Sequence, residues 1–254
     1  MRAVAVSAMF PLTALAMIAI HCHDASAQER VSTESGSADG DSTASGTRPL
    51  STRWKVLYLG RRSRGVRPLP STGPLTPLDD LKFVGADPGH PFYLGHFACD
   101  GRWGIVSGGL QRIEGSNAAF RIARAENFEL EGRAQMEKYG GWFLLVGWDQ
   151  GRGYSISSVT MKESGSPWFI AEFRGDRAIK ETNHRYDGFE WRNEQPFRVR
   201  VVDRKLTFEV GAITVLDQEE LSNYSEGDII FGVYDTRYGP RPVRIRALRI
   251  RAIE

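Results

Sequence analysis

The stretch FRVRVVDRKLTFEV, residues 197–210, decides the fold class. Apolar residues alternate with arginines over residues 197–201, and apolar residues alternate with polar ones again over residues 206–210. A period of two is typical of strands that bury one face. The residues DRK at 203–205 supply a polar turn between the two segments. The stretch therefore predicts an antiparallel β-hairpin.

The same alternation extends to both sides of this hairpin. Residues 128–136 place apolar side chains on one face and mostly charged ones on the other. In residues 243–252 the alternation changes phase at Ala247-Leu248, which predicts a β-bulge that keeps both halves facing the core. Beyond residue 103 no helical period extends over twelve residues, so we expect an all-β domain of two packed antiparallel sheets. Short helical turns are expected only near residues 76–82 and 218–223.

The N-terminus has the pattern of a secretory signal peptide. Arg2 precedes the apolar residues 3–20, and Ala25-Ser26-Ala27 forms a small-residue cleavage site. We therefore expect residues 1–27 to be removed, no membrane span to remain, and the mature protein to be extracytoplasmic, either periplasmic or secreted. Residues 28–47 are rich in Ser, Thr, Gly and Asp, which predicts a disordered polar spacer.

The rest of the chain is expected to form one domain, with residues 48–99 as an N-terminal extension that wraps the core formed by residues 100–254. The Pro and Gly content of residues 53–70 favours an irregular wrap over an added edge strand. Cys99 would be the one cysteine of the mature chain, which excludes an intrachain disulfide and favours a small buried hydrophobe. Residues 48–254 contain 31 basic and 26 acidic residues, a net charge of +5 that does not indicate a nucleic-acid partner.

Short motifs follow one another in a definite order after residue 100. They are WGIVSGGL at 103–110, FRI at 120–122, NFELEG at 127–132, GGWFLL at 140–145, GYSI at 153–156, the hairpin at 197–210, and closing strands within 232–251. This order resembles the concanavalin A-like lectin/glucanase superfamily and, within it, the 3-keto-disaccharide hydrolase-like secreted domains. The resemblance implies a jelly-roll β-sandwich and a carbohydrate partner. The Glu-x-Asp-x-Glu strand of the glucanase branch is absent.

The first candidate binding segment is residues 140–154. Trp142, Trp148 and Tyr154 could serve as flat platforms for sugar rings. Asp149 and Arg152 could form hydrogen bonds with the hydroxyl groups beside them. The alternative interpretation is a buried central strand followed by a hairpin turn at residues 149–153.

A second candidate cluster follows the strand near residue 233. It supplies two tyrosines, a carboxylate and two guanidiniums that could clamp a polar ligand, namely Tyr234, Asp235, Arg237, Tyr238 and Arg241. The alternative is a loop lock between the aspartate and one of the arginines, stiffened by two prolines.

Glycoside hydrolysis commonly uses two carboxylates as an acid/base pair. Glu172 shares a strand face with Arg174, and with Asp149 it makes the favoured catalytic pair. Glu129 and Glu131 have a suitable spacing on one strand face, but the charged neighbours on that face favour a solvated surface.

Other chemistries have little support in the sequence. The histidines show no metal-ligand spacing, and no cofactor is required, although loop oxygens of Asp87, Asp100 or Asp235 would suit calcium. Serine-hydrolase, phosphate-binding and dinucleotide motifs are absent. The favoured hypothesis is a domain that binds, with or without hydrolysing, glycosides or modified disaccharides. The alternative is a non-catalytic glycan-binding or envelope adhesion module.

Overall fold

The computed structural model describes residues 50–61, 65–69, 75–78, 81–84, 96–99, 101–115, 117–136, 140–159, 168–175, 177–184, 193–235 and 243–254. The predicted signal peptide and spacer therefore lie outside the described residues. Regular structure in the described part of the chain is β-strand throughout. The helical turns expected near residues 76–82 and 218–223 are wrong, since Thr76–Leu78 and Ile213–Glu220 are strands.

Eighteen strands in the described ranges form two nine-stranded sheets. Sheet A has the order β16 (Ile213–Glu220), β15 (Lys205–Val210), β14 (Gln195–Val202), β9 (Phe128–Gln135), β18 (Arg244–Ala252), β7 (Gly109–Glu114), β6 (Arg102–Val106) and β2 (Val66–Pro68), with β1 (Lys55–Leu59) paired to β18. Sheet B has the order β3 (Thr76–Leu78), β8 (Ala118–Ala125), β17 (Gly227–Asp235), β10 (Gly140–Asp149), β11 (Arg152–Val159), β12 (Trp168–Arg174), β13 (Arg177–His184), β4 (Lys82–Val84) and β5 (His96–Ala98).

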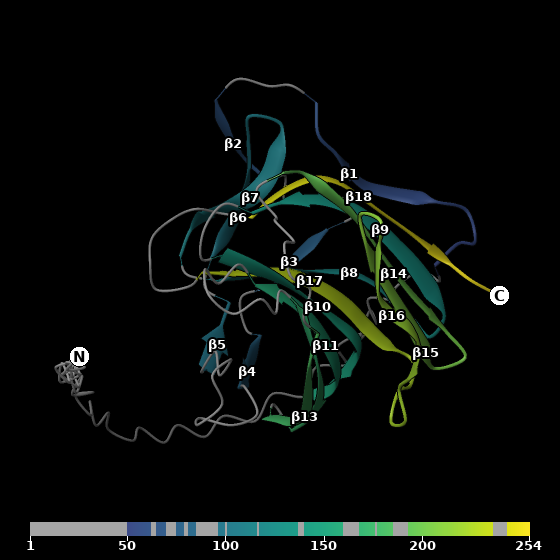
Figure 1. The fold of residues 1–254 in the computed structure, drawn as a ribbon. Helices are drawn as coiled ribbons and strands as arrows, with labels where there is room; N and C mark the ends of the chain where they lie inside the picture. Colours follow the sequence, from purple (N-terminus) through teal and green to yellow (C-terminus); the bar gives the residue numbers. More distant parts are fainter. Residues whose placement is uncertain are drawn as a thin grey trace, which may run out of the picture. The chain divides into compact units, whose positions relative to one another are not determined.

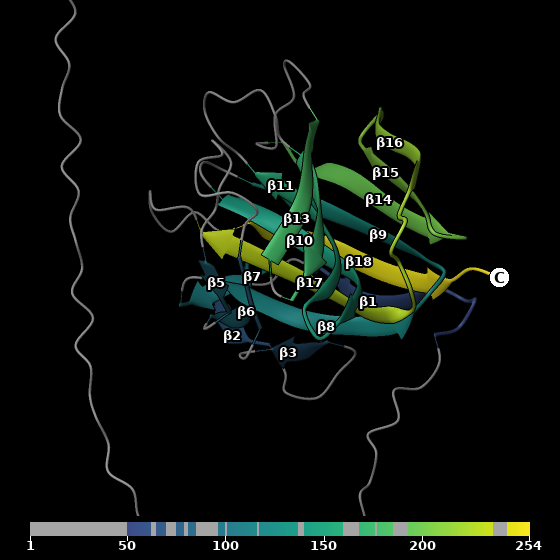
Figure 2. The ribbon, with the colours of Figure 1, turned by 90° about the horizontal axis from the view of Figure 1, so that it is seen from below.

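The two sheets pack as layers. In Figure 1, β1, β18 and β9 of sheet A lie above β8, β17 and β10 of sheet B. Figure 2 shows the last three side by side from below. Many neighbours in each sheet are distant in sequence, and all the pairings are antiparallel except the parallel contact of β13 with β4. The predicted all-β, two-sheet jelly-roll sandwich is confirmed.

The two local features that indicated the fold are both present. β14 and β15 pair as a hairpin, with Asp203 and Arg204 at φ values of 50° and 61°, as a type I′ turn requires. The register of β18 against β9 shifts between Ile245 and Ala247. Because of this bulge, Ile245 and Leu248 are both fully buried although they are three residues apart.

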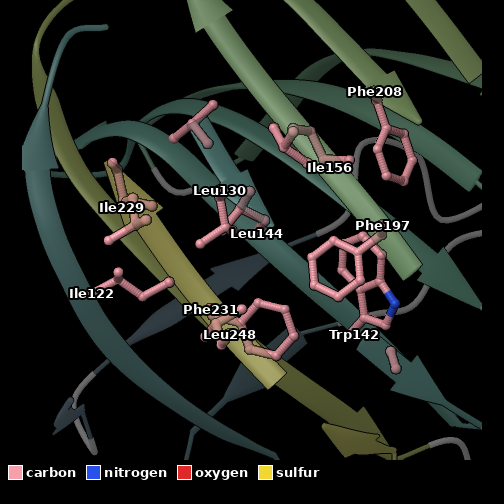
Figure 3. Close-up of a cluster of buried hydrophobic side chains, with 14 of the residues drawn as sticks. Ile122, Leu130, Trp142, Leu144, Ile156, Phe197, Phe208, Ile229, Phe231 and Leu248 are labelled. Carbon is pink, nitrogen blue, oxygen red and sulfur yellow. The ribbon is translucent and has the colours of Figure 1, made fainter. Parts of the chain in front are cut away.

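The core lies between the sheets and is built from alternate residues of both (Figure 3). Trp142 of β10 is fully buried at its centre. Its ring stacks on Phe197 of sheet A at a centroid distance of 4.9 Å and on Phe231 at 5.8 Å. Gly132 makes room for this contact, since a Cβ there would lie 2.3 Å from the Phe197 ring. The interpretation of Trp142 as a ligand platform is therefore wrong, because a core side chain presents no face to a ligand.

The other face of sheet B is also apolar. Phe143 and Leu145, which alternate with the core residues of β10, are at most 1% exposed. Leu81 and Cys99 pack in the same cluster, and Cys99 is fully buried as expected. A sheet that is buried on both faces explains why β10 shows a continuous apolar run instead of alternation.

The N-terminal extension contributes strands to both sheets. β1 pairs with β18, and β2 pairs with β6 at the edge of sheet A. The irregular wrap favoured for residues 53–70 is wrong over residues 55–59 and 66–68, which are strands. Pro68 occupies an edge strand, where a missing N–H donor is tolerated.

The outer face of sheet A carries alternating charges. We name this set the charge ladder: Glu129, Glu131, Arg198, Glu209, Arg249 and Arg251. Each member pairs across the strands, with Glu129 bound to Arg251, Glu131 to Arg249 and Arg198 to Glu209. Trp54 lies under two of the guanidiniums, 4.3 Å from Arg249 and 4.6 Å from Arg251.

Candidate functional site

A cleft of about 1000 Å³ opens at one end of the sandwich. Four segments line this end cleft: residues 149–150 and 152–154 of the β10–β11 hairpin, residues 172–175 at the end of β12, Arg204 in the β14–β15 turn, and residues 222–224 of the β16–β17 loop. Five side chains predicted as site residues therefore meet at one cleft, namely Asp149, Arg152, Tyr154, Glu172 and Arg174.

The hairpin turn places Asp149 and Arg152 opposite each other, and both are exposed. Gln150 and Gly151 between them have φ values of 46° and 81°, so the expected turn is confirmed as a tight two-residue connection. Two positive φ values in succession match the right-handed twist of the flanking strands. The turn thus presents a carboxylate and a guanidinium at the mouth of the end cleft.

A bulge at Gly147 decides which aromatic side chains reach this end. The register of β10 shifts between Val146 and Asp149, and Gly147 has a φ of 58°. Val146 faces the core, but Trp148, two residues on, lies in the apolar cluster on the opposite face. Trp148 is 6% exposed and packs on Phe173 at 5.5 Å. Its predicted role as a platform in this site is therefore wrong.

Glu172 and Arg174 extend from the face of β12 that continues the core. They pair as the sequence suggested, with Arg174 Nη2 3.5 Å from Glu172 Oε1. Asn223 makes the closer contact, since its Nδ2 donates to the same Oε1 at 2.7 Å. The Glu172 side chain is 11% exposed, so these two donors hold a largely buried carboxylate at the cleft wall.

Tyr154 lies opposite Glu172 in the pairing of β11 with β12. Its hydroxyl accepts the backbone N–H of Asn223 at 3.2 Å. Burial raises the pKa of Tyr154, and the nearby Glu172 carboxylate raises it further, whereas the Asn223 N–H and Arg174 oppose this. The phenol therefore keeps its proton at neutral pH. Tyr154 is only 6% exposed, so its ring offers little surface as a platform for a sugar.

Tyr224 closes the inner end of the cleft. Its ring lies 6.5 Å from that of Tyr154, and its hydroxyl donates to the carbonyl of Glu126 at 2.7 Å. A Cβ at Gly147 would lie 2.6 Å from the Tyr224 ring, so this glycine permits both the bulge and the packing of the loop. Burial raises the pKa of Tyr224 strongly.

Arg204 reaches the cleft from the other sheet. Its carbonyl accepts the N–H of Leu221 at 2.8 Å, and the preceding Asp203 N–H donates to Asn127 Oδ1 at 3.0 Å. These bonds hold the β14–β15 turn beside the β16–β17 loop, so the guanidinium starts from a fixed backbone position.

Sequence reasoning missed Arg204, Asn223 and Tyr224. They lie in a turn and a loop whose place beside β11 and β12 depends on how the sheets pack. No local pattern marks them, although the polar tip of the 197–210 hairpin is a position where an exposed guanidinium could have been expected.

The two described residues of the second predicted cluster lie away from this site on the backbone. Tyr234 and Asp235 pair with Gly141 and Gly140, the first residues of β10, whereas the end cleft adjoins Asp149, its last residue. Nine steps along a strand cover roughly 30 Å. Arg237, Tyr238 and Arg241 lie outside the described residues.

Within the described ranges, no three His, Cys, Asp or Glu side chains gather as a metal site. The aspartates considered for calcium are not tested, because Asp87 and Asp100 are outside those ranges and only the backbone of Asp235 is described. Among the described residues no helix is long and apolar enough to cross a membrane.

No protein-family model matches the sequence, and no curated protein sequence is similar to it. Among solved structures, the chain resembles the carbohydrate-binding module CBM66 from Bacillus subtilis, with 14% identity over 60% of this chain and 92% of that one and a TM-score of 0.47. A legume lectin-like domain from Entamoeba histolytica has 12% identity, coverage of 61% and 88%, and a TM-score of 0.49. The β-glucanase of Bacillus licheniformis has 11% identity, coverage of 74% and 98%, and a TM-score of 0.48.

These similarities are partial, and the class of protein, an antiparallel two-sheet sandwich, follows from the strand pairing described above.

Proposed function

We propose that the chain is an exported carbohydrate-binding domain that holds its ligand in the end cleft. The observation that carries this proposal is the convergence of five predicted polar and aromatic side chains at one cleft of about 1000 Å³. That volume is at the upper end of the range typical of small-ligand sites, which is roughly 300 to 1000 Å³.

The chemistry of the cleft wall suits hydroxyl-rich ligands. A sugar ring presents neighbouring hydroxyls, each of which both donates and accepts. Glu172 and Asp149 are acceptors, the arginines are paired donors, and the protonated Tyr154 hydroxyl can do both. Because Asn223 and Arg174 hold Glu172 in place, the acceptor is preorganised before a ligand arrives. The motif order that resembles the lectin/glucanase superfamily supports the same ligand class.

Binding can be tested with the mature domain, residues 28–254, on a glycan array followed by calorimetry with the oligosaccharides retained. We expect Glu172→Ala to lower affinity about tenfold, since it removes a preorganised charged acceptor. Glu131→Ala is the matched control, because this ladder glutamate is also bound to an arginine but lies on the outer face of sheet A. Absence of any glycan ligand, or equal affinity of Glu172→Ala and wild type, would refute the proposal.

A second candidate function is hydrolysis of a glycosidic bond. It is favoured by the two carboxylates, Asp149 and Glu172, on adjoining walls of one cleft. One would donate a proton to the leaving oxygen while the other acts as a base or nucleophile. Incubation of a bound oligosaccharide with wild type and with Asp149→Asn/Glu172→Gln tests this by product analysis. Hydrolysis predicts products from wild type alone, and a pure binding module predicts none from either.

Export is part of the proposal and rests on the N-terminal sequence. We expect the protein produced in a bacterial host to leave the cytoplasm and to begin at Gln28, as intact-mass measurement would show. Retention of residues 1–27 in a cytoplasmic product would contradict it.

A further inference from the structure

Three guanidiniums surround the end cleft. Arg152 comes from the β10–β11 turn, Arg174 from the end of β12 and Arg204 from the β14–β15 turn of the opposite sheet. Arg152 and Arg204 are exposed, and the Arg174 side chain is 60% exposed. With Asp149 and Glu172 as the acids of the cleft, basic groups are in excess by one charge.

The arginines of the cleft differ from those of the charge ladder in their partners. Arg198, Arg249 and Arg251 each bind a glutamate within sheet A. In the described part of the chain, neither Arg152 nor Arg204 has an ion pair or a side-chain hydrogen bond. Arg174 has only the 3.5 Å contact to Glu172, whose same oxygen is held more closely by Asn223.

Unpaired guanidiniums from separate elements indicate a negative charge on the missing partner. A guanidinium binds a carboxylate or sulfate through two parallel N–H donors, which fixes both position and orientation. Among the described residues, neither Asp149 nor Glu172 forms an ion pair with Arg152 or Arg204, and Glu172 Oε1 is held by Asn223. Arg152 and Arg204 therefore remain available to a ligand in the cleft.

We propose that the end cleft selects anionic saccharides, meaning sugars that carry a carboxylate or a sulfate group. This inference rests on the proposed carbohydrate-binding function and names its substrate class. The acidic group binds between Arg152 and Arg204, while Glu172, Tyr154 and Asn223 contact the ring hydroxyls.

Calorimetry with three probes tests this selectivity: an oligogalacturonate as the carboxylate, a sulfated galacto-oligosaccharide as the sulfate, and a neutral galacto-oligosaccharide of matched length. We expect at least one anionic probe to bind about tenfold more tightly than the neutral one at low ionic strength, and the difference to shrink as salt is raised. Which anionic probe binds best distinguishes carboxylate from sulfate.

Variants separate local recognition from overall charge. Arg152→Gln and Arg204→Gln should each lower affinity for the anionic probe about tenfold and leave affinity for the neutral probe within about twofold. Arg200→Gln is the control, because Arg200 is an exposed arginine on the outer face of sheet A with no ion pair among the described residues. It removes the same charge away from the cleft and should change neither affinity.

The outcomes distinguish this inference from the proposed function. Equal binding of neutral and anionic probes overturns the selectivity and leaves carbohydrate binding intact. An equal loss in Arg200→Gln also overturns it, since the effect would then come from net charge. Failure of all three probes to bind, with no ligand on the glycan array, overturns both.

Discussion

The end cleft and the charge ladder use the same residue types for opposite purposes. Both contain arginines and acidic side chains on strands of the sandwich. In the ladder every guanidinium meets a glutamate across the sheet, and Glu129 is 4% exposed beneath two of them. In the cleft, Arg152 and Arg204 are exposed, and Glu172 is held by the side-chain amide of Asn223.

The difference follows from register. The bonded pairs of the ladder lie directly across antiparallel strands: Arg198 faces Glu209, Arg249 faces Glu131 and Arg251 faces Glu129. Cleft residues lie at turns and strand ends, where pairing has stopped and side chains from both sheets meet. The ladder is therefore expected to support stability and the cleft to support binding.

The largest expected effect is alkaline loss of stability on the cleft side. Unfolded tyrosines ionise near pH 10, whereas burial raises the pKa of Tyr154 and Tyr224 in the folded protein. Above pH 10 the folded state thus binds more protons than the unfolded state, so the free energy of unfolding falls as pH rises. Urea unfolding at pH 8, 9.5 and 11 measures this fall.

Burial also raises the pKa of Tyr58 on β1, so part of the fall comes from outside the cleft. Tyr224→Phe removes one of these three titrating tyrosines and should make the fall with pH shallower, whatever its stability at pH 8. An unchanged slope in Tyr224→Phe would contradict the role assigned to burial.

The next effect concerns the buried acid of the ladder. Glu129→Gln removes the charge that Arg251 and Arg198 share, and we expect a loss of about 2 kcal/mol in the free energy of unfolding. Glu209→Gln, at a 29% exposed side chain, should cost less than half of that. Neither variant should alter oligosaccharide affinity. A drop in affinity would contradict the assignment of stability to the charge ladder and binding to the end cleft.

A comparable effect on binding is expected from the residue that joins the cleft walls. Asn223→Ala removes the 2.7 Å donor to Glu172, and we expect about a tenfold loss of affinity. Asn193→Ala makes the same substitution at an exposed asparagine outside the cleft lining and serves as the control, with affinity unchanged. Calorimetry at neutral pH measures both. Wild-type affinity in Asn223→Ala would show that Glu172 needs no such positioning.

The smallest effect on stability should come from the exposed ion pairs of the charge ladder. A double-mutant cycle with Glu131→Ala and Arg249→Ala should give a coupling of about 0.5 kcal/mol, because both side chains contact water. Denaturant unfolding of the four proteins measures it. A coupling of several kcal/mol would place the ladder among buried ion pairs instead.

The sequence predicted the fold well where alternation was regular. The 197–210 hairpin and the bulge in β18 both follow from period-two patterns, which one buried face imposes. β10 was less predictable because both of its faces are buried, so its apolar run does not show which side Trp142 faces. The strand β1 was not predicted, because the Pro and Gly content around it favoured an irregular segment.

The site was predictable in part for a similar reason. Asp149, Arg152, Tyr154, Glu172 and Arg174 lie on three consecutive strands, so adjacency in sequence became adjacency in space. The place of Trp148 was not predictable, because one positive φ at Gly147 moves it to the other face. Residues supplied by the other sheet or by loops depend on packing, which no single segment encodes.

The central claim is that the ligand occupies the end cleft and not the outer face of sheet A. Amide chemical-shift mapping with the tightest-binding oligosaccharide tests it most directly. We predict the largest shifts at Tyr154, Asn223 and Arg204, with those of Arg200 and Arg251 unchanged. Large shifts along the charge ladder, with the end cleft unperturbed, would contradict it.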